Sequence, residues 1–182
     1  MKRGARIVGG RFGGRRLEVV PGVRPTSSRS REALANIWSD RLSGARLLDC
    51  FAGSGAMAVE LIGRGVEQAT LVERSPKVLS ALRRNLGTLD RSLVDRVVEL
   101  VRVDLPDGGR RLGGTFDLIF ADPPYAFTAH EALLAVLRPR LASGGALVIE
   151  HGQSTDVAGS DVWDVVDRRR YGDTAMTFFA PV

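Results

Sequence analysis

The sequence predicts an α/β fold built on a mostly parallel β-sheet. From Ala45 onward, short apolar runs alternate with segments whose apolar residues recur at helical spacing. Strand-then-helix repetition covers both faces of a parallel sheet with helices and places ligands at the carboxyl ends of its strands. The final stretch, "WDVVDRRRYGDTAMTFFA", breaks the alternation, because two β-prone runs flank "YGD" and predict an antiparallel hairpin. We expect this hairpin to complete a sheet of seven strands.

The parallel part of the sheet has five expected strands, at residues 46–51, 69–73, 97–103, 116–121 and 146–150. Helices are expected between them at residues 55–64, 76–89 and 128–141. The helix at 76–89 has the clearest signal, because Ser75 can cap it and Pro76 suits its first position. A further helix should begin at Thr26 or Ser27. Its apolar stripe comprises Ala33, Leu34, Ile37, Trp38 and Leu42.

Positive charge is concentrated at the N-terminus. Residues 1–31 carry nine Lys and Arg against one Glu, or +8 where the whole chain is +5. The run "ARIVGGRFGGRRLEVV" holds two β-prone segments separated by glycines, which is typical of a hairpin. We expect residues 1–25 to form a basic hairpin arm and residues 26–182 to form the main domain. The charge favours a polyanionic partner such as nucleic acid, although a solvated, disordered tail explains it equally well. The expected contacts are Arg3, Arg6, Arg11, Arg15, Arg16, Arg24, Arg29 and Arg31.

Composition excludes several classes of protein. With 182 residues, 44% of them apolar, the chain fits a single globular domain. No apolar run approaches the length of a membrane span, and "MKRGARIVGG" lacks the apolar core of a signal peptide. Cys50 is the only cysteine, and His130 and His151 lack ligand-like spacing, so we expect neither a disulfide nor a metal. We expect a cytoplasmic monomer without a membrane partner.

Four successive expected strands finish in or next to an acidic residue: Asp49, Glu73, Asp104 and Asp122. The first strand runs into "DCFAGSGAMAVE", in which Gly53 and Gly55 permit a tight turn into a helix. This pattern also loosely matches a dinucleotide fingerprint with Glu73 about 20 residues on. However, an acidic crevice suits a ligand with hydroxyls, amines and positive charge better than a pyrophosphate. S-adenosylmethionine therefore fits better than NAD.

The motif "DPPY", Asp122 to Tyr125, follows the fourth strand and resembles motif IV of S-adenosylmethionine-dependent methyltransferases that act on exocyclic amines. The lone pair of an aryl amine is delocalised into its ring and is a poor nucleophile. If the Asp122 carboxylate and the Pro123 carbonyl each accept one N–H, the lone pair can localise and point at the methyl group. Tyr125 would stack on the extruded base, and Pro124 stiffens the turn.

Longer segments resemble one family in order and spacing: "RIVGGRFGGRRL", "RPTSSRSRE", "DCFAGSGAMAVELIGRG", "LVE", "DPPY" and "YGDTAMTFF". Together they resemble the RsmD family of bacterial 16S ribosomal RNA guanine-N2 methyltransferases, over nearly the whole chain. The resemblance implies a Rossmann-like class I methyltransferase fold, S-adenosylmethionine as cofactor, and ribosomal RNA or the assembling small subunit as partner. It implies a catalytic corner at Asp122, Pro123, Pro124 and Tyr125. The implied cofactor site comprises Asp49, Phe51, Gly53, Ser54, Gly55, Glu73, Arg74, Asp104 and Asp122, with Glu73 on ribose and Asp104 on adenine.

Other functions stay open at this stage. "DPPY" alone also serves a DNA or RNA adenine-N6 or cytosine-N4 methyltransferase, and protein glutamine methylation is chemically similar. A non-catalytic RNA-binding protein of ribosome assembly with a methyltransferase-like fold belongs to a different class. An intact glycine loop and the series of acids argue against that last possibility.

Overall fold

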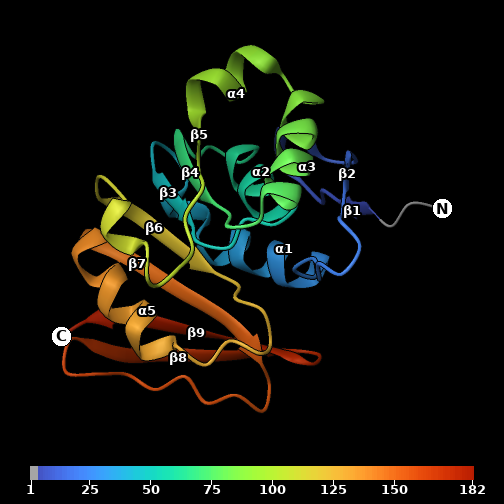
Figure 1. Cartoon of the computed structure of the whole chain (residues 1–182). Coiled ribbons are helices and arrows are strands. Elements are labelled where there is room, and N and C mark those ends of the chain that lie inside the picture. The colour runs from blue at the N-terminus through green and yellow to red at the C-terminus, as the bar shows by residue number, and fades with distance from the viewer. Residues whose placement is uncertain (1–3) are drawn as a thin grey trace.

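The computed structural model describes residues 4–182, which form a small N-terminal hairpin and a seven-stranded sheet covered by helices (Figure 1). The strand order of the large sheet is β5-β4-β3-β6-β7-β9-β8. Its strands are β3 (Arg46–Asp49), β4 (Gln68–Val72), β5 (Val98–Val101), β6 (Phe116–Ala121), β7 (Leu141–Gly152), β8 (Trp163–Tyr171) and β9 (Thr174–Pro181). Strands β3 to β7 are parallel, and β9 lies antiparallel between β7 and β8. The predicted Rossmann-like fold with a closing hairpin is confirmed.

Helices cover the two faces of this sheet unequally. One face packs against α1 (Ser28–Ile37), α2 (Ala56–Ile62), α3 (Pro76–Gly87) and α4 (Arg91–Val97), and the other against α5 (His130–Leu137) (Figure 1). Strand alternation explains the division, since successive side chains point to opposite faces. Leu47 packs in the cluster with α1 to α3, whereas Leu48 packs in the cluster with α5. None of the helices in the described residues is long and apolar enough to cross a membrane.

Helix boundaries follow local signals. Ser27 and Ser75 cap α1 and α3, because each side chain accepts a hydrogen bond from the amide three residues later. The helix expected at 128–141 is shorter, because Pro139 interrupts it and a 3₁₀ turn (Arg138–Arg140) leads directly into β7. The sequence reading missed α4, whose N-cap is Asp90 and which packs Val97 against the core. The third strand accordingly begins at Val98, one residue later than expected.

The N-terminal hairpin packs against the domain. Its strands β1 (Gly4–Arg6) and β2 (Arg16–Glu18) pair antiparallel, with a 3₁₀ turn (Gly10–Phe12) between them. Phe12 and Leu17 are buried in the same cluster as α1 and α2. Glu60 of α2 is fully buried, and its carboxylate accepts hydrogen bonds from the amides of Val8 (2.8 Å) and Gly9 (2.7 Å). The hairpin is therefore attached by both apolar and charged contacts, while the domain boundary at residue 25 stays a prediction.

Candidate active site

The predicted site residues meet where the strand order of the sheet reverses. β3 lies between β4 and β6, so successive crossovers leave it in opposite directions and open a crevice at the carboxyl ends. Asp49 ends β3 opposite Phe120 of β6, and the Cys50 amide donates to the Phe120 carbonyl at 2.9 Å. Asp122 follows β6 two residues after Phe120. The structure thus brings Asp49 and Asp122 to adjacent strand ends.

The glycine loop after β3 has a backbone that favours glycine. Gly53 and Gly55 have φ angles of +54° and +81°, in the left-handed region. Gly55 also lies against α3, because a Cβ at this position would come within 2.5 Å of Leu82 Cδ1. Gly55 is the N-cap of α2, so this close approach fixes where the helix starts beneath the crevice.

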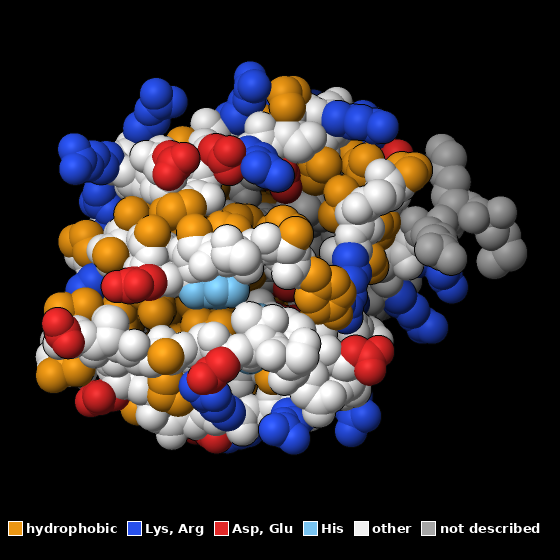
Figure 2. All heavy atoms as spheres, turned by 60° about the horizontal axis from the view of Figure 1, so that its bottom comes forward, with side chains coloured by type: hydrophobic (Ala, Val, Ile, Leu, Met, Phe, Trp, Pro, Cys, Tyr) orange, Lys and Arg blue, Asp and Glu red, His pale blue; other side chains and the backbone are white. Residues whose placement is uncertain are grey.

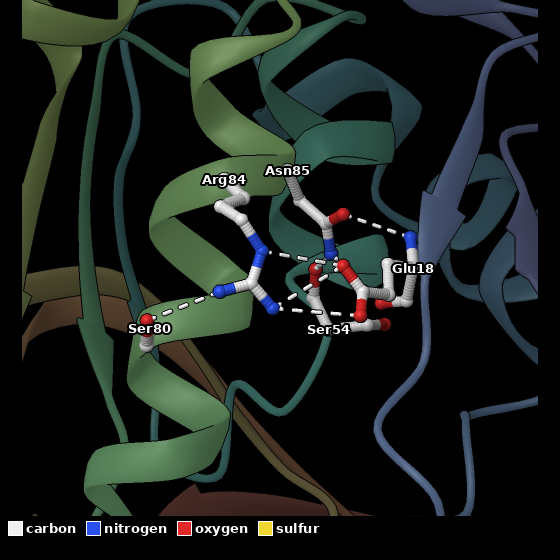
Figure 3. Close-up of polar contacts among 5 residues, drawn as sticks. All are labelled: Glu18, Ser54, Ser80, Arg84 and Asn85. Atoms are coloured by element: carbon white, nitrogen blue, oxygen red, sulfur yellow. Dashed lines mark hydrogen bonds and ion pairs between the residues drawn. The ribbon is translucent and has the colours of Figure 1, made fainter.

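Asn85 of α3 connects the glycine loop to the N-terminal hairpin (Figure 3). Its Nδ2 donates to the carbonyls of Ser54 and Glu18, both at 2.9 Å, and its Oδ1 accepts the Glu18 amide at 2.8 Å. Arg84 forms an exposed ion pair with the Glu18 side chain at 3.3 Å. Asn85 itself is only 4% exposed, which strengthens these hydrogen bonds relative to surface ones. The sequence reading missed this residue, because only the fold brings α3, the loop and the hairpin together.

Asp49 is a buried carboxylate at the end of β3. It is 1% exposed, and neither carboxylate oxygen accepts a hydrogen bond within the described part of the chain. Burial, followed by the charges of Asp122 and Glu73, raises the pKa of Asp49 to about 7, although the nearby backbone amides of Phe51 and Ala58 oppose this rise. An orphaned carboxylate is costly unless a ligand supplies donors or positive charge. The site therefore fits a cationic group such as the ammonium of S-adenosylmethionine.

Glu73 and Asp104 take different positions. Glu73 belongs to the crevice, because its Oε2 accepts a hydrogen bond from the Gly53 amide at 3.3 Å. Its Oε1 accepts a hydrogen bond from the Ser75 amide at 2.8 Å. Asp104 is exposed at the margin, where it pairs with Arg74 at 3.4 Å and borders a cavity of about 440 Å³ beside Asp107 and Gly108. Phe51 packs edge-on against Phe127, with ring centroids 5.6 Å apart. Three of the four predicted acids thus lie together, and Asp104 lies at the rim.

The "DPPY" corner is a turn stiffened by its two prolines. The Phe127 amide donates to the Pro124 carbonyl at 2.8 Å and closes the turn. The carbonyl of Pro123 accepts no hydrogen bond from the described residues, and a proline-proline step fixes its direction. The corner therefore offers two oxygen acceptors side by side in the chain, the Asp122 carboxylate and the Pro123 carbonyl.

The half-buried Asp122 pairs with a buried acid, Glu150, that the sequence reading did not identify. Glu150, near the end of β7, is 2% exposed and its Oε2 has no partner among the described residues. Burial raises the pKa of both carboxyl groups, and the Asp122 charge raises that of Glu150 further. A hydrogen bond from Thr26 and the charge of Arg24 oppose the increase at Asp122. Glu150 ends the expected strand "ALVIE", so the rule that singled out the other acids would also have found it.

Tyr125 exposes an aromatic face beside the corner. It is 56% exposed, and the Arg24 guanidinium lies 4.3 Å from its ring centroid. Gly152 of β7 supports the ring from below the corner, since a Cβ on Gly152 would lie 3.3 Å from two ring carbons. The ring is therefore held in place while it remains available for stacking.

The predicted RNA-binding arginines do not form one class. Arg6, Arg11, Arg15, Arg16, Arg24 and Arg29 are exposed, and Arg3 lies outside the described residues. Arg31 is wrong as an RNA contact, because it is 1% exposed and donates to the carbonyls of Thr26 and Arg6, each at 2.5 Å. Arg11 pairs with Asp90 at 2.6 Å. Basic side chains lie around the margins of the face drawn in Figure 2, with a histidine and apolar side chains nearer its middle.

Known proteins resemble this chain over most of its length. Residues 5–180 match the family described as Conserved hypothetical protein 95. Ribosomal RNA small subunit methyltransferase D of Escherichia coli is 39% identical over 122 residues, which are 66% of this chain and 60% of that protein. YlbH of Bacillus subtilis, which carries a provisional rRNA methyltransferase name, is 32% identical over 184 residues, covering 96% of this chain and 97% of that protein.

Solved structures of other proteins have a similar fold. The Escherichia coli protein yhhF, whose assignment as a methyltransferase is provisional, superposes with a TM-score of 0.81 at 30% identity, and the match covers 97% of both chains. The rRNA methyltransferase aviRa of Streptomyces viridochromogenes has a TM-score of 0.73 at 18% identity, covering 89% of this chain and 88% of its own. At that identity the second match supports the fold alone.

Proposed function

Because the chain belongs to the RsmD family, we propose that it methylates the exocyclic N2 amine of a guanine in small-subunit ribosomal RNA, with S-adenosylmethionine as methyl donor. The observation that carries the proposal is the position of Asp122. It follows β6 directly beside the orphaned carboxylate of Asp49, and the Pro123 carbonyl and the Tyr125 ring lie next to it in the chain. The guanine amine that accepts the methyl group and the cationic cofactor that donates it would thus meet at one edge of the sheet.

The cofactor would be held by the crevice around β3 and β4. Asp49 would accept hydrogen bonds from the ammonium group of S-adenosylmethionine, and Glu73 would accept them from the ribose hydroxyls. The loop at Gly53 to Gly55 would lie along the methionine part of the cofactor. Asp104 borders the cavity in which the adenine would lie, Arg74 pairs with Asp104, and Phe51 would supply an apolar wall. When bound, S-adenosylmethionine supplies an electrophilic methyl group on a sulfonium.

The corner would activate the acceptor. The Asp122 carboxylate and the Pro123 carbonyl would each accept one N–H of the guanine N2 amine, which orients its lone pair and favours positive charge on nitrogen as the bond forms. Tyr125 would stack on the base once it leaves its helix or loop. The exposed arginines of the hairpin would hold the RNA through its phosphates, and Arg31 would support them from within.

The decisive experiment identifies the modified nucleoside. Unmodified small-subunit RNA, free and in assembled particles, is incubated with protein and S-adenosylmethionine labelled in its methyl group, then digested to nucleosides. We expect label in N2-methylguanosine and none with Asp122→Ala. Label in N6-methyladenosine or N4-methylcytidine would redirect the proposal to another base. Tight RNA binding without any label would favour the non-catalytic alternative.

A further inference from the structure

The segment that joins the hairpin to α1 reaches the acceptor corner from far away in the sequence. The Thr26 hydroxyl donates to Asp122 Oδ2 at 2.5 Å across a separation of 96 residues. This is the only hydrogen bond to the Asp122 side chain within the described residues. It leaves Oδ1 without a protein partner at the position where the substrate amine is proposed to bind.

Thr26 is itself held in place by its neighbours. Its carbonyl accepts a hydrogen bond from the buried Arg31, whose other terminal nitrogen donates to the Arg6 carbonyl in the hairpin. The next residue, Ser27, caps α1 by accepting the Ser30 amide at 2.9 Å. The Thr26 backbone is thus fixed from the hairpin and from the start of α1, so its hydroxyl arrives at Asp122 in one orientation.

We propose that Thr26 is a positioning residue for Asp122, and this inference rests on the proposed function. A free carboxylate rotates about its last bond and exposes either oxygen. The Thr26 hydroxyl holds Oδ2, so Oδ1 is presented to the amine with a defined direction. Since a hydroxyl donates best to an ionised carboxylate, the same contact favours the form of Asp122 that can accept an N–H.

Charged groups around Asp122 act in both directions. Glu150 and Asp49 oppose its ionisation through their negative charge, since each lies close enough to couple to Asp122. Arg24 favours ionisation, and the buried Arg31 acts indirectly through its attraction to Glu150. Thr26 is the neighbour that contacts the carboxylate directly. Arg24 instead stacks on Tyr125, so its effect is one of charge and not of orientation.

The test compares Thr26→Val, which keeps the shape without the hydroxyl, with Thr26→Ser, which keeps the hydroxyl. Single-turnover methyl transfer to unmodified small-subunit RNA is measured from pH 5 to 9. We expect Thr26→Val to lower the rate roughly 10- to 100-fold, the loss typical of a misplaced reacting group. The acidic limb of its pH profile should move to higher pH. Thr26→Ser should stay within about 3-fold of the parent rate and keep its profile. Equal losses in both variants would overturn the proposal.

A second readout does not depend on turnover. Carbon-13 NMR titration of the Asp122 carboxyl should show a higher midpoint in Thr26→Val, and in Thr26→Ala should the valine variant not fold. The matched control is Thr115→Val, which makes the same change at an exposed threonine before β6 whose hydroxyl contacts Arg46 and not Asp122, and which should not move the midpoint. An unchanged Asp122 midpoint in Thr26→Val would refute the inference. If the parent protein methylated no guanine, the proposed function would fail, while this titration would still decide the role of Thr26.

Discussion

Replacing Gly55 with alanine tests the packing of the glycine loop. The φ of +81° places an alanine in the left-handed region, at a cost of about 1 to 2 kcal/mol. The new Cβ would also lie 2.5 Å from Leu82 Cδ1, and Leu82 is fully buried. Overpacking of this kind costs about 1 to 3 kcal/mol. The total expected loss in the free energy of unfolding is about 2 to 5 kcal/mol.

Gly14→Ala is the matched control for Gly55→Ala. Gly14 has a φ of +84°, and a Cβ there would meet nothing within 4 Å, so it should lose only the backbone contribution of about 1 to 2 kcal/mol. Urea unfolding of both variants isolates the clash as their difference. The double variant Gly55→Ala with Leu82→Ala should be more stable than the sum of its single changes implies, because the shorter side chain leaves room. Equal losses at Gly55 and Gly14 would refute the close approach of the loop to α3.

Three further perturbations address the hairpin, its connection to the loop, and the cofactor carboxylate. Asn85→Leu should lower the free energy of unfolding by about 2 to 4 kcal/mol, because it leaves buried backbone groups unpaired. It should also weaken S-adenosylmethionine binding in calorimetry. If neither stability nor binding decreased, Asn85 would not connect the loop to the hairpin. Glu60→Gln should weaken the hydrogen bonds to Val8 and Gly9 and increase proteolysis of the hairpin, with Glu67→Gln on the surface as the control; equal protease resistance would argue against attachment through Glu60. Asp49→Asn should abolish a rise in S-adenosylmethionine affinity that we expect as the pH passes about 7; a parent protein with pH-independent affinity would remove Asp49 from the ammonium site.

The parts of the fold that the sequence predicted are those with local signals. Apolar runs fix strands such as β6, and Ser75 with Pro76 fixes the start of α3. The short helix α4 was not predicted, because its seven residues are too few to give a clear apolar period. Helix α5 proved shorter than expected because Pro139 was not weighted as a stop.

The site divides in the same way. Asp49, Glu73 and Asp122 could be predicted because strand order alone brings their strand ends together. Thr26 could not, because its contact with Asp122 depends on how the segment before α1 crosses the sheet edge. Charge counting placed Arg31 among the RNA contacts, but composition carries no information on burial. The structure therefore adds to the sequence prediction those contacts that single side chains make with residues far away in the sequence.

The buried acids also connect stability to binding. Asp49, Asp122 and Glu150 all have raised pKa values in the folded protein because burial disfavours their charged forms. A raised carboxyl pKa contributes stability that is present at low pH and is lost as the pH rises through the folded value, about 7 for Asp49. In the free protein these carboxyl groups therefore ionise only against the cost of burial, which the Thr26 hydrogen bond offsets in part at Asp122. A cation or an amine that binds them reverses this cost, so the features that destabilise the crevice are those that select a positively charged donor and an N–H acceptor group.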